Sequence, residues 1–222
     1  MTDPDVVQSH CNGCLRLTRH DVLYRCHDDE TEEHDGQAYL ISKETYELVR
    51  CRGCENVSFR LASEFSGDPN EHVMYFPPAI SRRLPEYFRE LKWFWTPPYS
   101  DIYALFGEIY SSLHSGNRRL ALMGTRAVLD LAITHKLNDI GSFERKLDEA
   151  KRIGWITDIE YKTLEVAIDA GNAASHRAYC PTTEQLGRVL DIVEHFIERC
   201  YVLEESAGEI VKETPVRAKK KQ

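Results

Sequence analysis

Two pairs of cysteines carry the strongest chemical signal in this sequence. Each pair has the spacing Cys-x-x-Cys, Cys11 with Cys14 and Cys51 with Cys54, and a glycine precedes the second cysteine in both. Glycine permits the tight turn from which two thiolates face one ion, and four thiolates complete the tetrahedral shell that Zn²⁺ prefers. The spacing therefore predicts one zinc ion held by all four cysteines.

We expect this zinc to be structural. Four thiolates leave no coordination position open for water or a substrate, which a catalytic zinc requires. A thioredoxin-like redox pair has the same spacing, but it would not need two copies and would begin a helix. His10 or Cys26 could replace a thiolate that lay too far from the others. The remaining cysteines, Cys180 and Cys200, are expected in the core.

A second group of polar residues surrounds His176. Gly171 and Asn172 precede it at the end of an apolar helical pattern, where a glycine is typical of a helix C-cap. We therefore expect His176 to project from irregular backbone or from a helix start. One interpretation is an ordinary helix end with a packed or solvated histidine. The other is a polar site that His176 forms with Asn172, Arg126 and Arg177.

Alternating polar and apolar residues predict a small antiparallel sheet around the cysteine pairs. Residues 20–26 and 46–51 alternate, and residues 57–65 and 72–76 have the composition of further strands. Between the first two segments, residues 28–36 are strongly acidic, and we expect a solvated loop there. The predicted β domain spans residues 8–76. A sheet of this size buries too little apolar surface to be stable without its metal.

A proline-bounded connector, residues 77–99, is expected to follow the sheet. It contains the aromatic run Trp93-Phe94-Trp95. These rings could stack on nucleic-acid bases, but such a cluster more often packs at a domain junction.

From residue 100 onward the apolar residues repeat with helical spacing. We expect five helices: one from Asp101 to His114 capped by Ser100, one to about Leu137, one from Ser142 to Gly154, one from Thr157 to Gly171, and a long one that starts at Thr182. The second helix should present one apolar face formed by Leu120, Met123, Ala127, Leu131 and Thr134. Arg126 and Asp130 are four residues apart, so this helix could also present a charge pair to the polar site.

The helical domain is expected over residues 100–205, followed by a disordered basic tail over residues 206–222. The small residues Ala121 and Gly124 and the broad apolar stripe of the last helix favour a homodimer through the helical domain. The fold class is therefore α+β, a small zinc-ribbon-like antiparallel β domain followed by an all-α bundle.

The charge of the chain is concentrated in its first part. The net charge of −8 belongs to residues 1–80, and the remaining residues are neutral overall. An acidic chain is a poor non-specific ligand for nucleic acid, so any contact with RNA or DNA must be local. No apolar run approaches the length of a membrane span, and the acidic start of the chain is unlike a secretion signal. We expect a cytoplasmic protein with no membrane contact.

The order of these features resembles a bacterial family called domain of unknown function 4145. The resemblance covers most of residues 10–203 and is carried by His20-Asp21-Val22-Leu23-Tyr24, Cys51-Arg52-Gly53-Cys54 with Val57-Ser58-Phe59-Arg60, Arg118-Arg119-Leu120-Ala121, Gly124-Thr125-Arg126-Ala127, and Gly171-Asn172 with His176-Arg177. The helical part is similar to the HEPN superfamily of helical bundles. That similarity implies dimerisation, and many HEPN proteins are metal-independent ribonucleases of toxin and phage-defence systems.

The sequence departs from the HEPN pattern at one position. Active members carry the motif R-x-x-x-x-H, in which the arginine stabilises phosphate charge and the histidine transfers protons at the 2′-hydroxyl or the leaving oxygen. Aligned on His176, the arginine position is Gly171, whereas Asn172 fits the pattern. Arg126 or Arg177 could supply the missing guanidinium.

Two functions follow from this comparison. The first is a non-catalytic, zinc-containing, dimeric binding or scaffold module that acts with nucleic acid or a protein partner in bacterial defence. The second is an endoribonuclease that uses His176 with a displaced arginine. The loss of one positioned charge-stabilising donor typically lowers an enzymatic rate about a hundred- to a thousand-fold, which favours the first.

Overall fold

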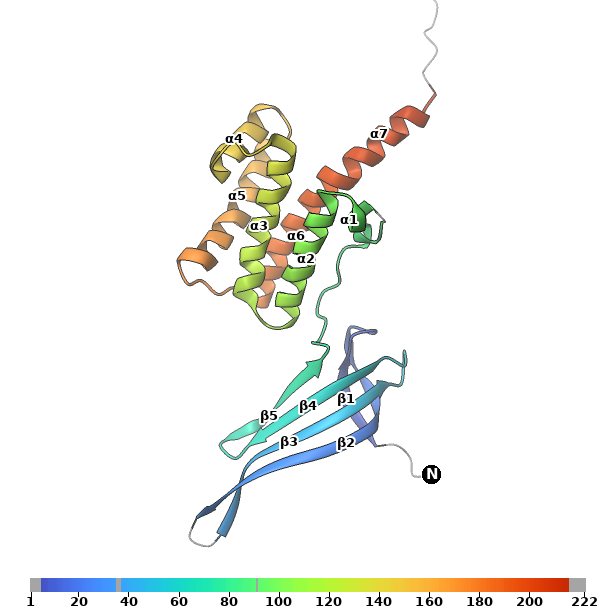
Figure 1. The fold of residues 1–222 in the computed structure, drawn as a ribbon, viewed down its shortest axis with the longest axis vertical. Helices are drawn as coiled ribbons and strands as arrows, with labels where there is room; N and C mark the ends of the chain where they lie inside the picture. Colours follow the sequence, from blue (N-terminus) through green and yellow to red (C-terminus); the bar gives the residue numbers. More distant parts are fainter. Residues whose placement is uncertain (1–4, 35–36, 91, 216–222) are drawn as a thin grey trace, which may run out of the picture. The chain divides into compact units, whose positions relative to one another are not determined.

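The computed structural model describes residues 5–34, 37–90 and 92–215. The chain divides into two compact units, Met1–Arg83 and Leu84–Gln222. The first unit is a curled antiparallel sheet and the second is a bundle of helices (Figure 1). The α+β fold class is thus confirmed. The second unit begins at Leu84, so much of the expected connector over residues 77–99 belongs to the helical unit.

The strands of the first unit follow one another in space in their order along the chain, each antiparallel to its neighbours. They are β1 (Val6–Cys11), β2 (Arg16–His34), β3 (Gln37–Cys51), β4 (Val57–Phe65) and β5 (Asp68–Phe76). All four segments that were predicted as strands lie within β2 to β5, and β4 has the predicted bounds.

The acidic segment that was predicted as a loop is part of the sheet. Residues 28–34 continue β2 and pair with residues 37–44 of β3, from Asp28 opposite Glu44 to His34 opposite Gln37. The prediction was wrong for these residues because backbone pairing along a long hairpin is compatible with acidic side chains that face water. Asp35 and Gly36 lie outside the described residues.

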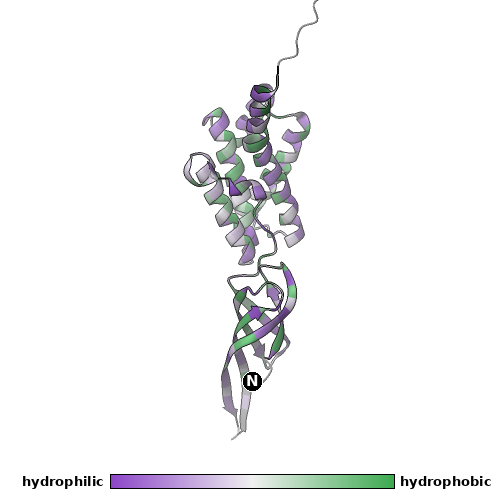
Figure 2. Ribbon diagram, turned by 90° about the vertical axis from the view of Figure 1, so that its right-hand side faces the viewer, coloured by the Kyte–Doolittle hydropathy of each residue, from purple (hydrophilic) through white to green (hydrophobic). Residues whose placement is uncertain are grey.

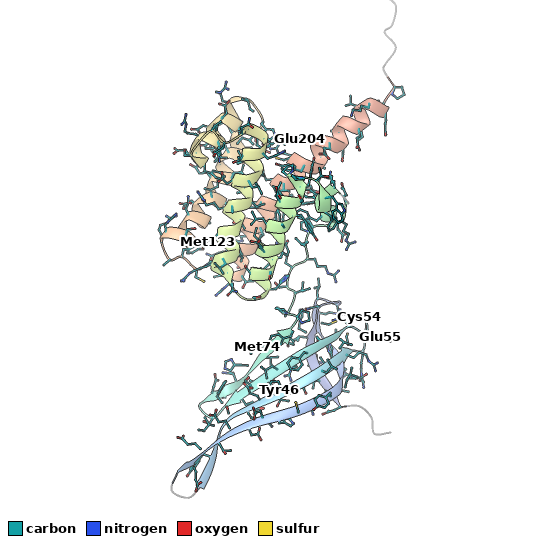
Figure 3. All side chains as sticks on the ribbon, in the orientation of Figure 1. Tyr46, Cys54, Glu55, Met74, Met123 and Glu204 are labelled. Atoms are coloured by element: carbon teal, nitrogen blue, oxygen red, sulfur yellow. The ribbon has the colours of Figure 1, made fainter. Side chains whose placement is uncertain are left out.

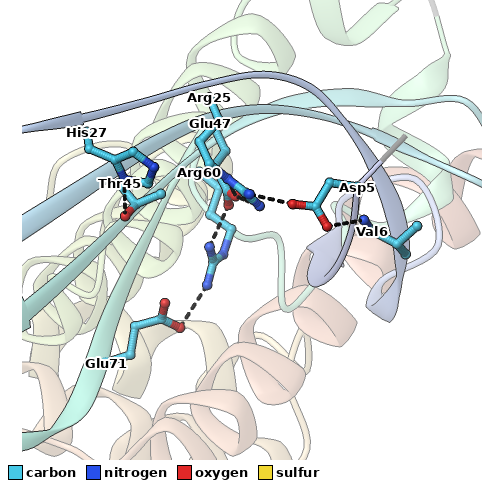
Figure 4. A network of polar contacts seen from close by, with 8 residues as sticks. All are labelled: Asp5, Val6, Arg25, His27, Thr45, Glu47, Arg60 and Glu71. Carbon is cyan, nitrogen blue, oxygen red and sulfur yellow. Dashed lines mark hydrogen bonds and ion pairs between the residues drawn. The ribbon is translucent and has the colours of Figure 1, made fainter. Parts of the chain in front are cut away.

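A buried carboxylate joins two arginines on one face of this sheet (Figure 4). Glu47 is 1% exposed, and its two oxygens accept hydrogen bonds from Nε of Arg25 at 2.7 Å and from a terminal nitrogen of Arg60 at 2.6 Å. Arg60 also donates to Glu71 at 2.7 Å. The hydrogen bond with Glu47 raises the pKa of Arg25. Burial lowers the pKa of Arg60, but its bonds to Glu47 and Glu71 outweigh this and raise it.

The second unit is built from helices of very different length. They are a 3₁₀ turn (Glu86–Arg89), α1 (Lys92–Trp95), α2 (Tyr99–His114), α3 (Arg118–Leu137), α4 (Phe143–Arg152), α5 (Asp158–His176), α6 (Thr183–Glu198), a π-helical turn (Arg199–Leu203) and α7 (Glu204–Glu213). Helix α3 packs against α2, α4, α5 and α6 and is therefore the centre of the bundle. In the parts of the chain that the structure describes, no helix is long and apolar enough to cross a membrane.

The aromatic run of the expected connector splits between the core and the surface. Trp93 is fully buried and its ring centroid lies 4.7 Å from that of Phe88 and 5.2 Å from that of Tyr99. Trp95 is 81% exposed. Trp93 therefore belongs to the core of the helical unit, whereas Trp95 does not.

Three of the predicted helix starts are formed by the expected side chains. Ser142 caps α4 by accepting the Arg145 N–H, and Thr157 and Thr182 open α5 and α6 with complete capping boxes. Ser100 is not a cap, because α2 begins at Tyr99 after Pro98, without a side-chain cap. The proline restricts the backbone just before the helix, which begins two residues earlier than predicted.

The predicted apolar face of α3 was wrong. Leu120 and Met123 are exposed, and the buried side of the helix is formed instead by Ala121, Leu122, Thr125, Val128, Leu129, Ala132 and Ile133. Ala121 and Gly124 face the interior, since a Cβ on Gly124 would lie 2.5 Å from Cγ1 of Ile109. The small residues that favoured a dimer are thus used for packing inside the bundle, as is the apolar stripe of α6.

Two further predictions were wrong. The disordered tail was expected from residue 206, which lies inside α7, and Cys180 was expected in the core but is exposed. Residues 204–213 form α7, which follows α6 through the π-helical turn, and residues 216–222 lie outside the described part of the chain. Cys200 is buried as expected, but Cys180 is exposed in the segment between α5 and α6. A single cysteine outside a helix has no periodicity from which its burial can be read.

Candidate metal centre

The four cysteines lie in two matching turns of the sheet. Cys11 ends β1 and Cys51 ends β3. Their carbonyls accept hydrogen bonds from the backbone N–H groups of Leu15, at 2.7 Å, and Glu55, at 3.0 Å. Leu15 and Glu55 have φ angles of 55° and 61°, the left-handed conformation that closes each turn. The two turns therefore share one backbone design, which aims both cysteine pairs at a common point.

The four sulfur atoms form a compact cluster. Sγ of Cys11 lies 3.4 Å from Sγ of Cys54, Sγ of Cys14 lies 3.9 Å from Sγ of Cys51, and all four lie within 4.8 Å of one another. A tetrahedral ion with bonds of about 2.3 Å to sulfur separates its ligands by about 3.8 Å. The cluster has these dimensions, so the four cysteines could hold one metal ion.

Glycine is required in only one of the two turns. A Cβ on Gly13 would lie 2.7 Å from Sγ of Cys54, which is closer than any side chain can approach. A Cβ on Gly53 would lie 3.7 Å from Sγ of Cys51 and 3.8 Å from Sγ of Cys14, which are ordinary contacts. The sequence shows the same residue in both turns, but only the structure separates their roles.

Hydrogen bonds to sulfur favour a thiolate at Cys51. The Thr18 hydroxyl lies 3.3 Å from its Sγ and the Gly53 N–H donates to it at 3.4 Å. Burial raises the pKa of Cys51, but these bonds outweigh it and lower the pKa to about 6. The hydrogen bond of Cys14 with Cys54 is the main cause that raises the pKa of Cys14 to about 12. A metal ion bound by the four sulfurs would displace the protons that they carry.

His10 and Cys26, which were expected as possible substitute ligands, are not part of this cluster. Nε2 of His10 lies 3.1 Å from the carbonyl oxygen of Ile80. Cys26 is exposed in the middle of β2, opposite Tyr46 of β3. Since the four paired cysteines already lie together, no substitute ligand is needed.

The turn at the first cysteine pair also binds the segment that follows the sheet. The side chain of Asn12 donates to the carbonyl of Pro78 at 3.0 Å and accepts the N–H of Ile80 at 2.8 Å. Arg83 donates to the carbonyl of Gly13 at 2.7 Å. Nothing in the local sequence pattern links residues so far apart. A metal that orders this turn also orders the end of the sheet unit.

The second candidate site is arranged differently from its prediction. Gly171 is not a C-cap, because α5 continues through it to His176. It is buried against α3, and a Cβ there would lie 2.7 Å from the Cβ of Arg126. The glycine thus serves close packing of two helices, and His176 is the exposed last residue of α5, not part of irregular backbone.

The two candidate arginines are both engaged elsewhere. The guanidinium of Arg126 lies over the ring of Phe143, 5.9 Å from its centroid, and its buried Nε has no hydrogen-bond partner within the described residues. Arg177 donates to the carbonyl of Asp169 at 3.0 Å and to its carboxylate at 2.6 Å.

The expected charge pair of Arg126 with Asp130 is not formed. Asp130 instead accepts a hydrogen bond of 2.9 Å from the buried Lys146 of α4. Burial lowers the pKa of Lys146, but its bonds to Asp130 and Asp139 outweigh this and raise it. Lys146 belongs to another helix, so the spacing of residues within α3 could not predict it as the partner of Asp130.

Three members of the predicted polar site lie near one cavity, because Arg177 also binds Asp169 of its lining. Phe143 lies under Arg126 and lines a cavity of about 520 Å³ together with Asn172. The side chain of His176, exposed at the end of α5, has no hydrogen bond or ion pair within the described residues. The metal cluster is therefore an assembled site, whereas the His176 group is not.

Comparison with known proteins identifies the helical unit alone. Residues 107–214 match the family model described as Domain of unknown function (DUF4145). No curated protein and no solved structure matches the chain. The match includes the Gly171–Arg126 contact and His176 and leaves the cysteine cluster outside it.

Proposed function

We propose that the chain, whose residues 107–214 match the family model described as Domain of unknown function (DUF4145), is a non-catalytic binding or scaffold module with a structural zinc ion. Cys11, Cys14, Cys51 and Cys54 hold the zinc. The ion keeps the end of the sheet in one conformation, and the helical unit contacts the partner through the surface near His176.

The choice of zinc rests on the ligands and their spacing. Four thiolates at tetrahedral separations favour Zn²⁺ or an iron–sulfur centre over hard ions such as Mg²⁺. Elemental analysis of protein purified without chelator tests the assignment. We expect about one zinc per chain, and a preparation without zinc, or with iron and sulfide in its place, would overturn it.

The non-catalytic assignment is carried by the contact between Gly171 and Arg126. Because a Cβ on Gly171 would lie 2.7 Å from the Cβ of Arg126, an arginine side chain does not fit at the position where the motif requires it. Arg177, the other candidate, is bound to Asp169. A histidine without a positioned cation has little means to stabilise the charge of a phosphoryl transition state.

The decisive experiment compares the protein with a His176→Ala variant. We expect neither to cleave a mixed RNA substrate. Because His176 is exposed at the end of α5, the substitution should leave the melting temperature nearly unchanged while RNA or partner binding is lost. The matched control is His195→Ala, which removes an exposed histidine of α6 and should leave binding intact. A large fall in stability with binding intact would contradict the proposal.

One observation favours the alternative, an endoribonuclease with a displaced arginine. Arg126 lies against the motif position itself, and its Nε has no partner in the described residues. RNA cleavage that is abolished by both His176→Ala and Arg126→Ala, and is insensitive to chelators, would establish this function and exclude the first.

The wider setting of the proposal comes from the resemblance to HEPN proteins. It includes a homodimer, an RNA, DNA or protein partner, and a role in bacterial defence. A cytoplasmic location fits seven cysteines that form no disulfide in the structure.

A further inference from the structure

Several large apolar side chains of the sheet are exposed on the face opposite the Glu47–Arg60 network. Cross-strand partners share a face of a sheet, so the strand register defines two apolar rows, which we call the apolar face. The first row contains Tyr24, Leu48, Phe59 and Phe76, and the second contains Cys26, Tyr46, Leu61 and Met74. Tyr46 and Met74 are labelled in Figure 3.

The buried face of the sheet combines the Glu47–Arg60 network with Val49 and Ala62, whereas the opposite face keeps large apolar side chains exposed around Leu61, which is 9% exposed. On the apolar face Tyr24 is 64% exposed, Met74 52% and Phe76 49%, whereas Glu47 on the other face is 1% exposed. One-sided antiparallel sheets normally bury the apolar face and solvate the polar one. Figure 2 shows the apolar segments of these strands in green. A contiguous exposed patch of this kind marks an interaction surface.

The ends of the apolar face carry opposite charge. Beyond the first row, Asp21, Arg50 and Val57 form the next row, and Arg52 binds Asp21 at 2.6 Å. Beyond the second row come Asp28, Glu44, Ser63 and His72, and after them Glu30, Ser42, Phe65 and Asp68. The face therefore runs from an end with excess arginine to an end with excess carboxylate.

We propose that the apolar face is covered by the same face of a second copy of this chain. The charges decide between the two ways in which a two-fold axis can relate stacked sheets. An axis in the plane between the sheets and parallel to the strands would place the arginine end of each copy over the arginine end of the other, and the acidic end over the acidic end. An axis perpendicular to the strands places Arg50 of each copy over Glu44 of the other, which is favourable at both ends. The two copies then form a sandwich with their strands antiparallel.

The area of the apolar face determines how tightly the two copies bind each other. Five rows across four strands measure roughly 14 Å by 27 Å from the usual strand and residue spacings, or about 800 Å² for the two copies together. Stable protein interfaces bury about 1,200–2,000 Å², so a reversible dimer is expected, with a dissociation constant in roughly the micromolar range. This surface lies on the sheet and not on the helical domain, where the resemblance to HEPN proteins places a dimer, so the inference goes beyond the proposed function and does not rest on it.

The test is a charge exchange in the full-length, metal-loaded protein, followed by sedimentation equilibrium over a range of concentrations. Arg50→Glu and Glu44→Arg should each weaken the dimer at least about tenfold, because each places two like charges together at both ends. The double variant Arg50→Glu/Glu44→Arg should restore it. Rescue by the double variant cannot arise from misfolding. If both single variants dimerise like the wild type, or the double variant does not recover, the inference is wrong.

Two methionines provide a matched control for the apolar contact. Met74 lies on the apolar face and Met123 lies exposed on α3 of the helical unit (Figure 3). Met74→Glu should produce a monomer and Met123→Glu should not. The opposite result would place the interface on the helical unit, and a wild-type protein that stays monomeric at every concentration would overturn the inference. The RNA and zinc experiments are independent of all these outcomes.

Discussion

Gly171 of α5 packs against Arg126 of α3 so closely that a Cβ on the glycine would lie 2.7 Å from the Cβ of the arginine. The carbonyl oxygen of Leu122 would lie 3.4 Å from the same Cβ. The two helices therefore approach through a position where only glycine fits. This contact explains the glycine inside a long helix and also removes the position that an active-site arginine would occupy.

Gly171→Ala should destabilise the helical unit. We expect its free energy of unfolding to fall by about 1–3 kcal/mol, since overpacking forces two helices apart. Gly107→Ala in α2, where a Cβ would meet nothing within 4 Å, is the control and should gain about 0.5–1 kcal/mol. All three tryptophans lie in this unit, so urea denaturation followed by tryptophan fluorescence measures both variants. Equal effects would contradict the packing argument.

Gly13→Ala should impair metal binding, and Gly53→Ala should not. The added methyl group meets Sγ of Cys54 at 2.7 Å in the first case and makes ordinary contacts in the second. Zinc transfer to a colorimetric chelator measures both; we expect the first variant to release its metal at least about tenfold more readily, in the range seen when the surroundings of metal ligands are altered. Similar release from both variants would mean that the cluster relaxes around the added group.

The seven cysteines should react with a thiol reagent at pH 8 in three groups. Cys26 and Cys180 are exposed and should react at once. The four clustered cysteines should react only after a chelator removes the metal. Burial raises the pKa of Cys200 to about 12, so its thiol stays protonated and should react only on unfolding. A titration that yields six fast thiols without chelator would show that no metal is bound.

Glu47→Gln should destabilise the sheet unit more than Glu71→Gln. Glu47 is buried between Arg25 and Arg60, and loss of its charge leaves two guanidinium groups without a full counter-charge. We expect the free energy of unfolding to fall by about 3 kcal/mol. The Glu71 side chain is 44% exposed, so its loss should change stability by less than about 1 kcal/mol. The temperature of metal release reports on the sheet unit, and equal shifts would contradict this ranking.

The sequence by itself determined the features that depend on neighbouring residues. The two Cys-x-x-Cys turns were predicted as a pair because two thiolates and a glycine within four residues already define the local geometry. The starts of α4, α5 and α6 at Ser142, Thr157 and Thr182 followed from side chains that bond to the backbone three residues on. The α+β class followed from the change of hydrophobic period from two residues to 3.6.

Amino-acid composition did not predict the secondary structure correctly where pairing between strands determines it. Residues 28–34 are acidic enough to suggest a loop, yet they pair with residues 37–44 across a hairpin that extends the sheet. The sequence also did not predict that a glutamate of the sheet is buried while a tyrosine is exposed. Glu47 and Tyr24 both occur in alternating segments, and the pattern alone does not tell which side of the sheet is buried.

Only the tertiary structure decided the role of Gly171 and the surroundings of His176. A glycine near the end of an apolar pattern is usually a C-cap, and its use as a contact point becomes visible only when α3 lies against it. The same holds for Asn12, which binds Pro78 and Ile80, and for Lys146, which takes Asp130 away from Arg126. These contacts join residues distant in the chain, and their free energy comes from packing and burial that exist only after the helices and strands have assembled.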